Sequence, residues 1–186
     1  MTRRDIPNLI TLLRLLLLAP FVLFLLDGKY AVALLVFAVA GISDGIDGYL
    51  ARGHGWSTPL GAILDPVADK LLMATSYLTL GWLQLIPLWI VVLVIGRDLI
   101  ILGGALAYTH LVKRPEMAPS RISKFNTAAQ IIFMLSVLTA LSGVDLPHWW
   151  VRAWLAIMVT TTVWSGSDYV WRWSNRALRE HKEQRG

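Results

Sequence analysis

The sequence has no cysteine and few charged residues. Without cysteine, the chain cannot form a disulfide framework, a zinc–thiolate site or a cysteine nucleophile. Lys, Arg, Asp and Glu together make up 16% of the 186 residues, whereas soluble domains carry about 25%. Linkers, low-complexity tracts and internal repeats are also missing from the sequence. We therefore expect residues 1–186 to form a single domain that is not an ordinary soluble one.

Apolar residues account for 56% of the chain and gather in six long segments, each near the length of a bilayer span. Turn residues such as Asp27-Gly28 and Gly143 to Pro147 separate the segments. The sequence therefore predicts an all-α, polytopic integral membrane protein. The predicted transmembrane helices cover residues 8–27, 30–52, 59–82, 86–110, 121–143 and 149–172. Residues 173–186 are predicted to form a polar helical extension.

The net charge of +5 follows the predicted membrane topology. If the N-terminus is cytoplasmic, most Lys and Arg residues lie in cytoplasmic loops and tails. The outer loops then hold only Lys29 and the nearby Arg152. This is the positive-inside pattern, and an even number of spans places both termini in the cytoplasm. The basic excess is accordingly attributed to topology, and a nucleic-acid partner is not expected.

Four aspartates interrupt the second and third apolar segments. Asp44 and Asp47 are three residues apart, and Asp65 and Asp69 are four apart, so each pair shares one face of its helix. The turn between the helices centres near Gly55. In an antiparallel hairpin the two pairs reach similar depth. We therefore predict that all four carboxylates meet in one cavity that is open to the cytoplasm.

Four clustered carboxylates repel one another and need cations or protons to coexist. Oxygen ligands without nearby histidine or cysteine suit hard ions such as Mg²⁺, Mn²⁺ or Ca²⁺. Two divalent cations would balance the charge, and a two-metal carboxylate site is suited to phosphoryl chemistry. Arg52, at the end of the second segment, is placed to pair with a phosphate. Small residues that let a polar ligand approach the backbone surround the aspartates: Gly41, Gly45, Gly48, Ala51, Gly61 and Ala62.

Two other interpretations remain open for the aspartates. In the first, they form a purely structural network with Lys70, Arg97 and Arg14. In the second, they line a metal-ion or proton pathway of a transporter.

The stretch from Asp44 to Asp69 resembles the signature of the CDP-alcohol phosphatidyltransferase family at every fixed position. The matching residues, in order, are Asp44, Asp47, Gly48, Ala51, Arg52, Gly61, Asp65 and Asp69. Six transmembrane helices are also the family architecture, so the resemblance extends over essentially the whole chain.

The resemblance implies a transfer of a phosphatidyl group from CDP-diacylglycerol to an alcohol, with release of CMP. It implies that Asp44, Asp47 and Asp65 bind two divalent cations, Mg²⁺ or Mn²⁺. Asp69 is implied to be a ligand or near-ligand and the general base. Residues implied to shape the CDP pocket are Gly48, Ala51, Arg52 and Gly61. Homodimers are usual in the family, and we expect the site to face the cytoplasm, in a bacterial inner membrane.

The acceptor alcohol has to be inferred from other segments. The stretches Ile6–Leu17, Leu85–Gly104 and Ile122–Gln130 resemble the branch that contains CMP-forming cardiolipin synthases and phosphatidylglycerophosphate synthases. The last two stretches favour phosphatidylglycerol as the acceptor, with cardiolipin as the product. The alternative acceptor is glycerol 3-phosphate.

Cationic residues are expected to hold the acceptor phosphate, and those best placed are Arg97, Arg121 and Lys124. For Arg121 and Lys124 the alternative is topological anchoring, and for Arg97 it is a local pair with Asp98. Asn8 either bonds the nucleotide or caps the first helix.

Overall fold

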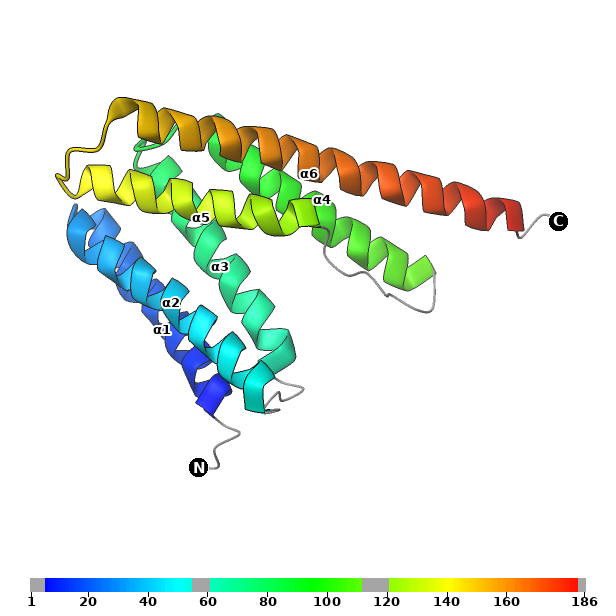
Figure 1. Cartoon of the computed structure of the whole chain (residues 1–186), viewed down its shortest axis with the longest axis horizontal. Helices are drawn as coiled ribbons and strands as arrows, with labels where there is room; N and C mark the ends of the chain where they lie inside the picture. Colours follow the sequence, from blue (N-terminus) through cyan, green and yellow to red (C-terminus); the bar gives the residue numbers. More distant parts are fainter. Residues whose placement is uncertain (1–5, 55–60, 112–120, 184–186) are drawn as a thin grey trace. The chain divides into compact units, whose positions relative to one another are not determined.

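A computed structural model of the chain contains six α-helices within the residues it describes, and no strand there (Figure 1). It describes the backbone of residues 6–54, 61–111 and 121–183, and most of their side chains; those of 6–8, 44–54, 62–63, 105–111, 121, 170 and 172–183 are outside the description. The helices are α1 (Ile6–Leu26), α2 (Tyr30–His54), α3 (Gly61–Trp82), α4 (Leu88–Leu111), α5 (Arg121–Leu141) and α6 (His148–Glu183).

The all-α prediction is confirmed, and the predicted helix limits agree with the structure to within two residues at every end but one. The exception is α6, which continues to Glu183 as one helix of 36 residues. The polar extension that was predicted to follow the sixth span is therefore part of the same helix.

The helices group into two compact units. The first unit comprises Met1–Ile86 with Met134–His148, and the second comprises Pro87–Phe133 with Trp149–Gly186. The unit boundary falls within α5, between Phe133 and Met134.

In the first unit, α1 packs against both α2 and α3. Phe21 of α1 and Phe37 of α2 are buried, and their ring centroids lie 5.8 Å apart in a tilted arrangement. Tyr77 and Leu80 of α3 are fully buried as well. Tight side-chain packing of this kind is the main source of helix association where lipid surrounds the helices. Because α1 touches both neighbours, its polar side chains are available to residues of α3.

Helices α1 and α3 each end in a hydrogen-bonded turn of the same type. After α1, Gly28 has a φ of 71° and the Lys29 amide donates to the Phe24 carbonyl at 2.8 Å. After α3, Gln84 adopts a φ of 57° and the Leu85 amide donates to the Leu80 carbonyl at 2.9 Å. Such turns need a left-handed residue, which glycine adopts without strain. The break at Gly28 was predicted, whereas nothing in the sequence marked Gln84.

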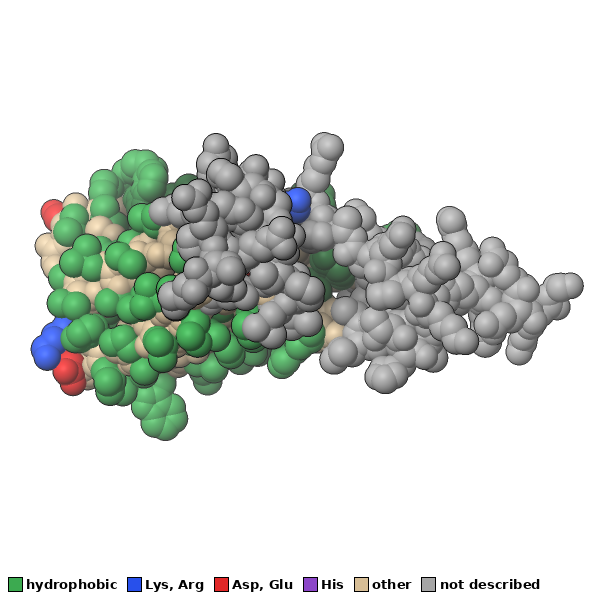
Figure 2. Space-filling view, turned by 90° about the horizontal axis from the view of Figure 1, so that it is seen from below, with side chains coloured by type: hydrophobic (Ala, Val, Ile, Leu, Met, Phe, Trp, Pro, Cys, Tyr) green, Lys and Arg blue, Asp and Glu red, His purple; other side chains and the backbone are tan. Residues whose placement is uncertain are grey.

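Large apolar side chains are exposed along the helices. Leu16, Leu35 and Val92 are each 64% exposed, and the described side chains in Figure 2 are mostly hydrophobic. Within the described residues, Leu9–Leu26 and Ile122–Leu141 are long and apolar enough to cross a membrane. Exposed apolar surface of this extent is typical of a membrane or protein contact. The structure thus supports the membrane prediction for two helices, and the six-span topology stays a prediction.

The stability that depends on the left-handed conformation of Gly28 can be measured by comparing alanine substitutions at Gly28 and Gly41. A Cβ at either position would meet no atom of the described residues within 4 Å, and of the two only Gly28 has a positive φ. We expect Gly28→Ala to lower the free energy of unfolding by about 1–2 kcal/mol because of left-handed strain. Gly41→Ala, inside α2, should raise it by about 0.5–1 kcal/mol. Thermal unfolding in detergent micelles measures both, and changes of the same sign would contradict the explanation.

Candidate functional site

Two hydrogen bonds join α1 to the aspartates of α3. Thr11 and Arg14 are three residues apart on α1, so they share a face of that helix. The Thr11 hydroxyl donates to Oδ1 of Asp65. Arg14 Nη1 donates to Oδ1 of Asp69 at 2.6 Å, which makes an ion pair. Both α3 carboxylates are therefore held by side chains of α1.

One partner of the Arg14–Asp69 ion pair is buried, and the other is partly exposed. The Arg14 side chain is 0% exposed, whereas that of Asp69 is 45% exposed. A buried guanidinium is strongly unfavourable unless an anion compensates it. Asp69 provides that compensation, and almost half of its side chain surface remains exposed.

The order of these contacts shows how α1 and α3 run. Thr11 precedes Arg14 on α1, and their partners Asp65 and Asp69 follow in the same order on α3. The two helices therefore point in the same direction where they touch, as Figure 1 also shows. This is the direction expected if α1, α2 and α3 cross a membrane alternately.

The other residues predicted for this site belong to the helices, but most of their side chains lie outside the described part. Asn8 lies in α1, and Gly61 is the first residue of α3 and is buried. Residues of α2 whose side chains are not described are Asp44, Asp47, Gly48, Ala51 and Arg52. Among the described side chains there is no group of three or more potential metal ligands. The meeting of all four carboxylates thus stays a prediction.

The donor atoms at the α1–α3 contact suit a hard cation. Asp65 and Asp69 provide carboxylate oxygens, and Thr11 contributes a hydroxyl next to Asp65. Oxygen donors of this kind are what Mg²⁺ and Mn²⁺ prefer in proteins. The described half of the predicted site therefore fits a divalent cation.

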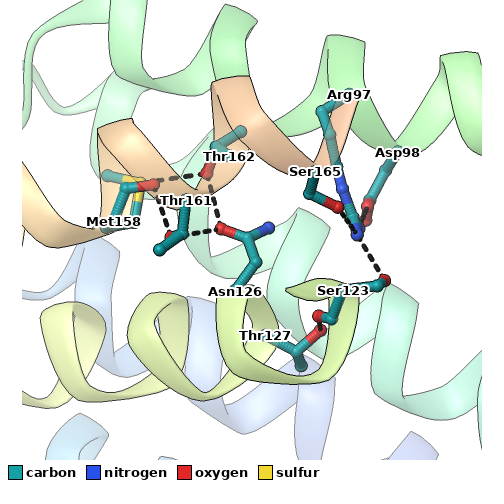
Figure 3. Close-up of polar contacts among 9 residues, drawn as sticks. All are labelled: Arg97, Asp98, Ser123, Asn126, Thr127, Met158, Thr161, Thr162 and Ser165. Atoms are coloured by element: carbon teal, nitrogen blue, oxygen red, sulfur yellow. Dashed lines mark hydrogen bonds and ion pairs between the residues drawn. The ribbon is translucent and has the colours of Figure 1, made fainter. Parts of the chain in front are cut away.

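A second polar cluster, in the second unit, surrounds Arg97 of α4 (Figure 3). The Arg97 side chain is only 7% exposed, and its Nη1 donates to Asp98 at 2.6 Å. Its Nη2 donates to Ser123 of α5 at 2.6 Å and to Ser165 of α6 at 2.8 Å. The local Arg97–Asp98 pair, which was one of the two alternatives for Arg97 in the sequence, is therefore present. The same guanidinium also joins three helices.

Asn126 forms the next layer of this cluster, one turn after Ser123 on α5. Its Oδ1 accepts hydrogen bonds from Thr161 at 2.9 Å and Thr162 at 2.8 Å, both on α6 (Figure 3). The Asn126 side chain is fully buried. Arg97 Nε and Asn126 Nδ2 are buried donors with no partner among the described residues. Unpaired buried donors are rare and usually face an acceptor such as a water or a ligand oxygen.

A cavity of about 630 Å³ lies beside this cluster, between α4 and α6. Gly96 and Gly166 line it. Among the described residues, a Cβ on Gly96 would meet nothing within 4 Å and one on Gly166 would meet only Arg97 Cγ, at 3.8 Å. The volume is in the range of small-ligand sites, about 300–1,000 Å³. Its other lining residues are mostly apolar: Val92, Leu93, Ile100, Thr162, Val163, Ser167 and Trp171.

The remaining cationic candidates lie on α5. Lys124 is exposed, and Arg121 is the first residue of the helix, with its side chain outside the description. Residues that the sequence reasoning missed are Thr11, Ser123, Asn126, Ser165, Thr161 and Thr162. Of these, Thr11 had a signal: with Asn8 and Arg14 it repeats every three residues in an otherwise apolar run.

Comparison with known proteins gives consistent results. Residues 4–164 match the model of a family described as CDP-alcohol phosphatidyltransferase. A "Probable phosphatidylglycerophosphate synthase" of Mycobacterium tuberculosis is 34% identical over 182 residues, covering 95% of this chain and 83% of the relative. A "CDP-diacylglycerol--glycerol-3-phosphate 3-phosphatidyltransferase" of Salmonella typhimurium is 34% identical over 178 residues, covering 89% and 93%. A "Cardiolipin synthase (CMP-forming)" of Rattus norvegicus is 34% identical over 154 residues, covering 73% and 50%.

The Ser165 bond to Arg97 can be tested against a serine with an ordinary bond. Ser165→Ala removes an acceptor from a buried guanidinium and should lower the free energy of unfolding by about 1.5–3 kcal/mol, the range for bonds to charged groups. Ser142→Ala removes only a bond from its hydroxyl to the Thr139 carbonyl, and should cost about 0.5–1.5 kcal/mol. Equal losses in thermal unfolding would show that Arg97 does not depend on Ser165.

Proposed function

Because the chain belongs to the CDP-alcohol phosphatidyltransferase family, we propose that it transfers a phosphatidyl group from CDP-diacylglycerol to an alcohol and releases CMP. The observation that carries this proposal is the family match over residues 4–164. That range contains all four aspartates and Arg97. The α1–α3 contact supports it independently, because it sets two carboxylates on one helix face, with the Thr11 hydroxyl beside Asp65 and the Arg14 guanidinium beside Asp69.

The protein is further proposed to cross the membrane six times, with both termini and the site on the cytoplasmic side, in a bacterial inner membrane and as a homodimer. The shared direction of α1 and α3 supports alternating spans, and the positive-inside pattern supports the orientation. The membrane is also where the diacylglycerol part of the donor resides.

The proposed cofactors are two divalent cations, Mg²⁺ or Mn²⁺, with Asp44, Asp47 and Asp65 as ligands. Asp69 is proposed as a ligand or near-ligand. When bound, such cations hold a diphosphate and offset the charge that develops on its oxygens. Two features support this proposal. The proposed ligands are all carboxylate oxygens, and the Thr11 hydroxyl fixes one oxygen of Asp65.

In the proposed reaction, Asp69 accepts the proton of the acceptor hydroxyl while the hydroxyl oxygen attacks the phosphorus that bears diacylglycerol. The bond from that phosphorus to the CMP oxygen breaks, and CMP leaves with the electron pair. Asp69 suits the role because its side chain is half exposed while Arg14 fixes its direction. Residues proposed to shape the nucleotide pocket are Asn8, Gly48, Ala51, Arg52 and Gly61.

The proposed acceptor is phosphatidylglycerol, which would give cardiolipin. Arg97, with Arg121 and Lys124, is proposed to hold the acceptor phosphate, and the two unpaired donors of the Arg97 cluster support this. Glycerol 3-phosphate is the second candidate. Its support is that the Mycobacterium and Salmonella relatives, whose names refer to this chemistry, match 95% and 89% of the chain.

A product assay distinguishes the acceptors. Purified protein receives CDP-diacylglycerol and Mg²⁺ or Mn²⁺, with either phosphatidylglycerol or glycerol 3-phosphate, and mass spectrometry identifies the lipids. We expect cardiolipin and CMP with phosphatidylglycerol, and no product after chelation of the metal. Phosphatidylglycerophosphate formed only with glycerol 3-phosphate would move the function to the second candidate. Ion flux into proteoliposomes without CMP release would instead support a transporter.

The base can be tested by Asp69→Asn. This variant cannot accept the proton and should lose about 10²–10⁴-fold in kcat. Asp27→Asn is the matched control, since Asp27 is an exposed partner of Lys29 in the α1–α2 turn, and it should keep normal turnover. Full transfer activity in Asp69→Asn would show that Asp69 is not the base.

A further inference from the structure

The cavity between α4 and α6 is an elongated groove, and both helices belong to the second unit. On α4 its lining residues recur one turn apart, at Val92, Gly96 and Ile100. On α6 they extend from Thr162 to Trp171. At a rise of 1.5 Å per residue, Val92 and Ile100 are about 12 Å apart along the helix axis. The groove therefore follows α4 for about two turns.

The wall of the groove is apolar even where Arg97 contributes to it. Figure 3 shows the guanidinium turned toward Asp98, Ser123 and Ser165, which its two Nη atoms contact. The aliphatic part of the same side chain lies next to Gly166, because a Cβ there would meet Arg97 Cγ at 3.8 Å. Long cationic side chains commonly cover apolar surface with their stems in this way. Arg97 thus turns its charge to the polar cluster and its stem to the groove.

The groove opens on an exposed apolar surface of these two helices. Val92, Ile100 and Val163 line it, and each is more than half exposed. Trp171 lines it as well and is 70% exposed. Exposed apolar surface of this kind is typical of a contact with lipid or protein. An occupant can therefore reach the groove from the surface of α4 and α6.

We propose that this groove holds one acyl chain of the phospholipid acceptor. The inference rests on the proposed function, in which Arg97 holds the acceptor phosphate. A phospholipid carries its phosphate and its acyl chains on one glycerol unit, so a phosphate at the guanidinium brings a chain close to the Arg97 stem. Glycerol 3-phosphate has no acyl chain and would leave the groove unused. The groove therefore favours phosphatidylglycerol as the acceptor.

Gly96 provides a position from which the groove can be filled. It lines the groove, and a Cβ there would meet no atom of the described residues within 4 Å. A leucine at this position is therefore expected to project into the groove without a clash. Leucine also favours the helix more than glycine does, so α4 should not be weakened.

The first experiment measures transfer from CDP-diacylglycerol to dioleoyl or dihexanoyl phosphatidylglycerol in mixed micelles with Mg²⁺. Gly96→Leu should raise the KM for the dioleoyl acceptor by about 10-fold or more, since one methylene in an apolar pocket changes discrimination by about 10–200-fold. The KM for the dihexanoyl acceptor should change little, because its short chains do not depend on the groove. The KM for CDP-diacylglycerol and the kcat should stay at their normal values.

Gly103→Leu is the matched control, because it introduces the same side chain on the same helix. A Cβ on Gly103 would also meet no described atom within 4 Å, and Gly103 is not among the described residues that line the groove. This variant should keep the normal KM for both phosphatidylglycerols.

A second experiment detects the chain without turnover. Phosphatidylglycerol with brominated acyl chains should quench the fluorescence of Trp171, whose contribution among the nine tryptophans is obtained by subtracting the signal of Trp171→Phe. Quenching should reach half its maximum at a lower mole fraction than with brominated diacylglycerol, which lacks the phosphate. Gly96→Leu should reduce this quenching, and Gly103→Leu should not.

Four results would overturn the inference. A higher KM for CDP-diacylglycerol in Gly96→Leu would assign the groove to the donor. Equal increases in KM for the long and short acceptors would mean that the substitution disturbs the acceptor site itself. Equal quenching by the two brominated lipids would reduce the groove to general contact with lipid. Loss of a dimer as the sole effect of Gly96→Leu would assign it to a second copy of the chain.

Failure of this inference is distinguishable from failure of the proposed function. If the unaltered chain transfers only to glycerol 3-phosphate, the phosphatidyltransferase chemistry stands and the acyl-chain site is wrong. If it transfers to neither acceptor, the proposed function is wrong and the acceptor role of the groove falls with it.

Discussion

A guanidinium enclosed among apolar helices must have an anion beside it, and in the first unit this constraint is met by Arg14 and Asp69. The pair requires the face of α1 that carries Arg14 to meet the face of α3 that carries Asp69. Once that face is set, Thr11 falls opposite Asp65 and both helices point the same way. The geometry of the candidate site is thus a consequence of one charge that water cannot solvate.

The second unit meets the same constraint in another way. Arg97 pairs with its sequence neighbour Asp98, and its remaining bonds go to hydroxyls on two other helices. A neighbouring pair places no demand on helix packing, so here the serines determine how α5 and α6 approach α4. One turn further along α5, the uncharged Asn126 side chain accepts hydrogen bonds from Thr161 and Thr162 of α6. One unit therefore uses an ion pair between helices, and the other uses a network of hydroxyls.

The sequence predicted the helices well because apolar length and turn residues are local properties. Gly28 marks its turn, since glycine is the residue that adopts a positive φ without strain, whereas Gln84 takes the same conformation with no such mark. The aspartates were identified because ionised groups are rare in apolar segments. Ser123 and Ser165 were not, because serine is common in helices and its partner lies 26 or 68 residues away. Asp44, Asp47 and Arg52 keep their predicted roles as predictions, since their side chains are outside the described residues.

The separation between Arg14 and its partner also bears on how the protein is made. The two residues are 55 positions apart, which corresponds to about 3–11 s of synthesis at 5–20 residues per second. In the proposed membrane topology, α1 enters the bilayer during that time, before Asp69 has been synthesised, and an arginine near the helix centre costs about 2.5–3.5 kcal/mol. The leucines around Arg14, each favourable by about 0.3–0.6 kcal/mol, are numerous enough to offset it. The leucine-rich composition of α1 thus serves insertion as well as packing, and α3 completes the pair when it arrives.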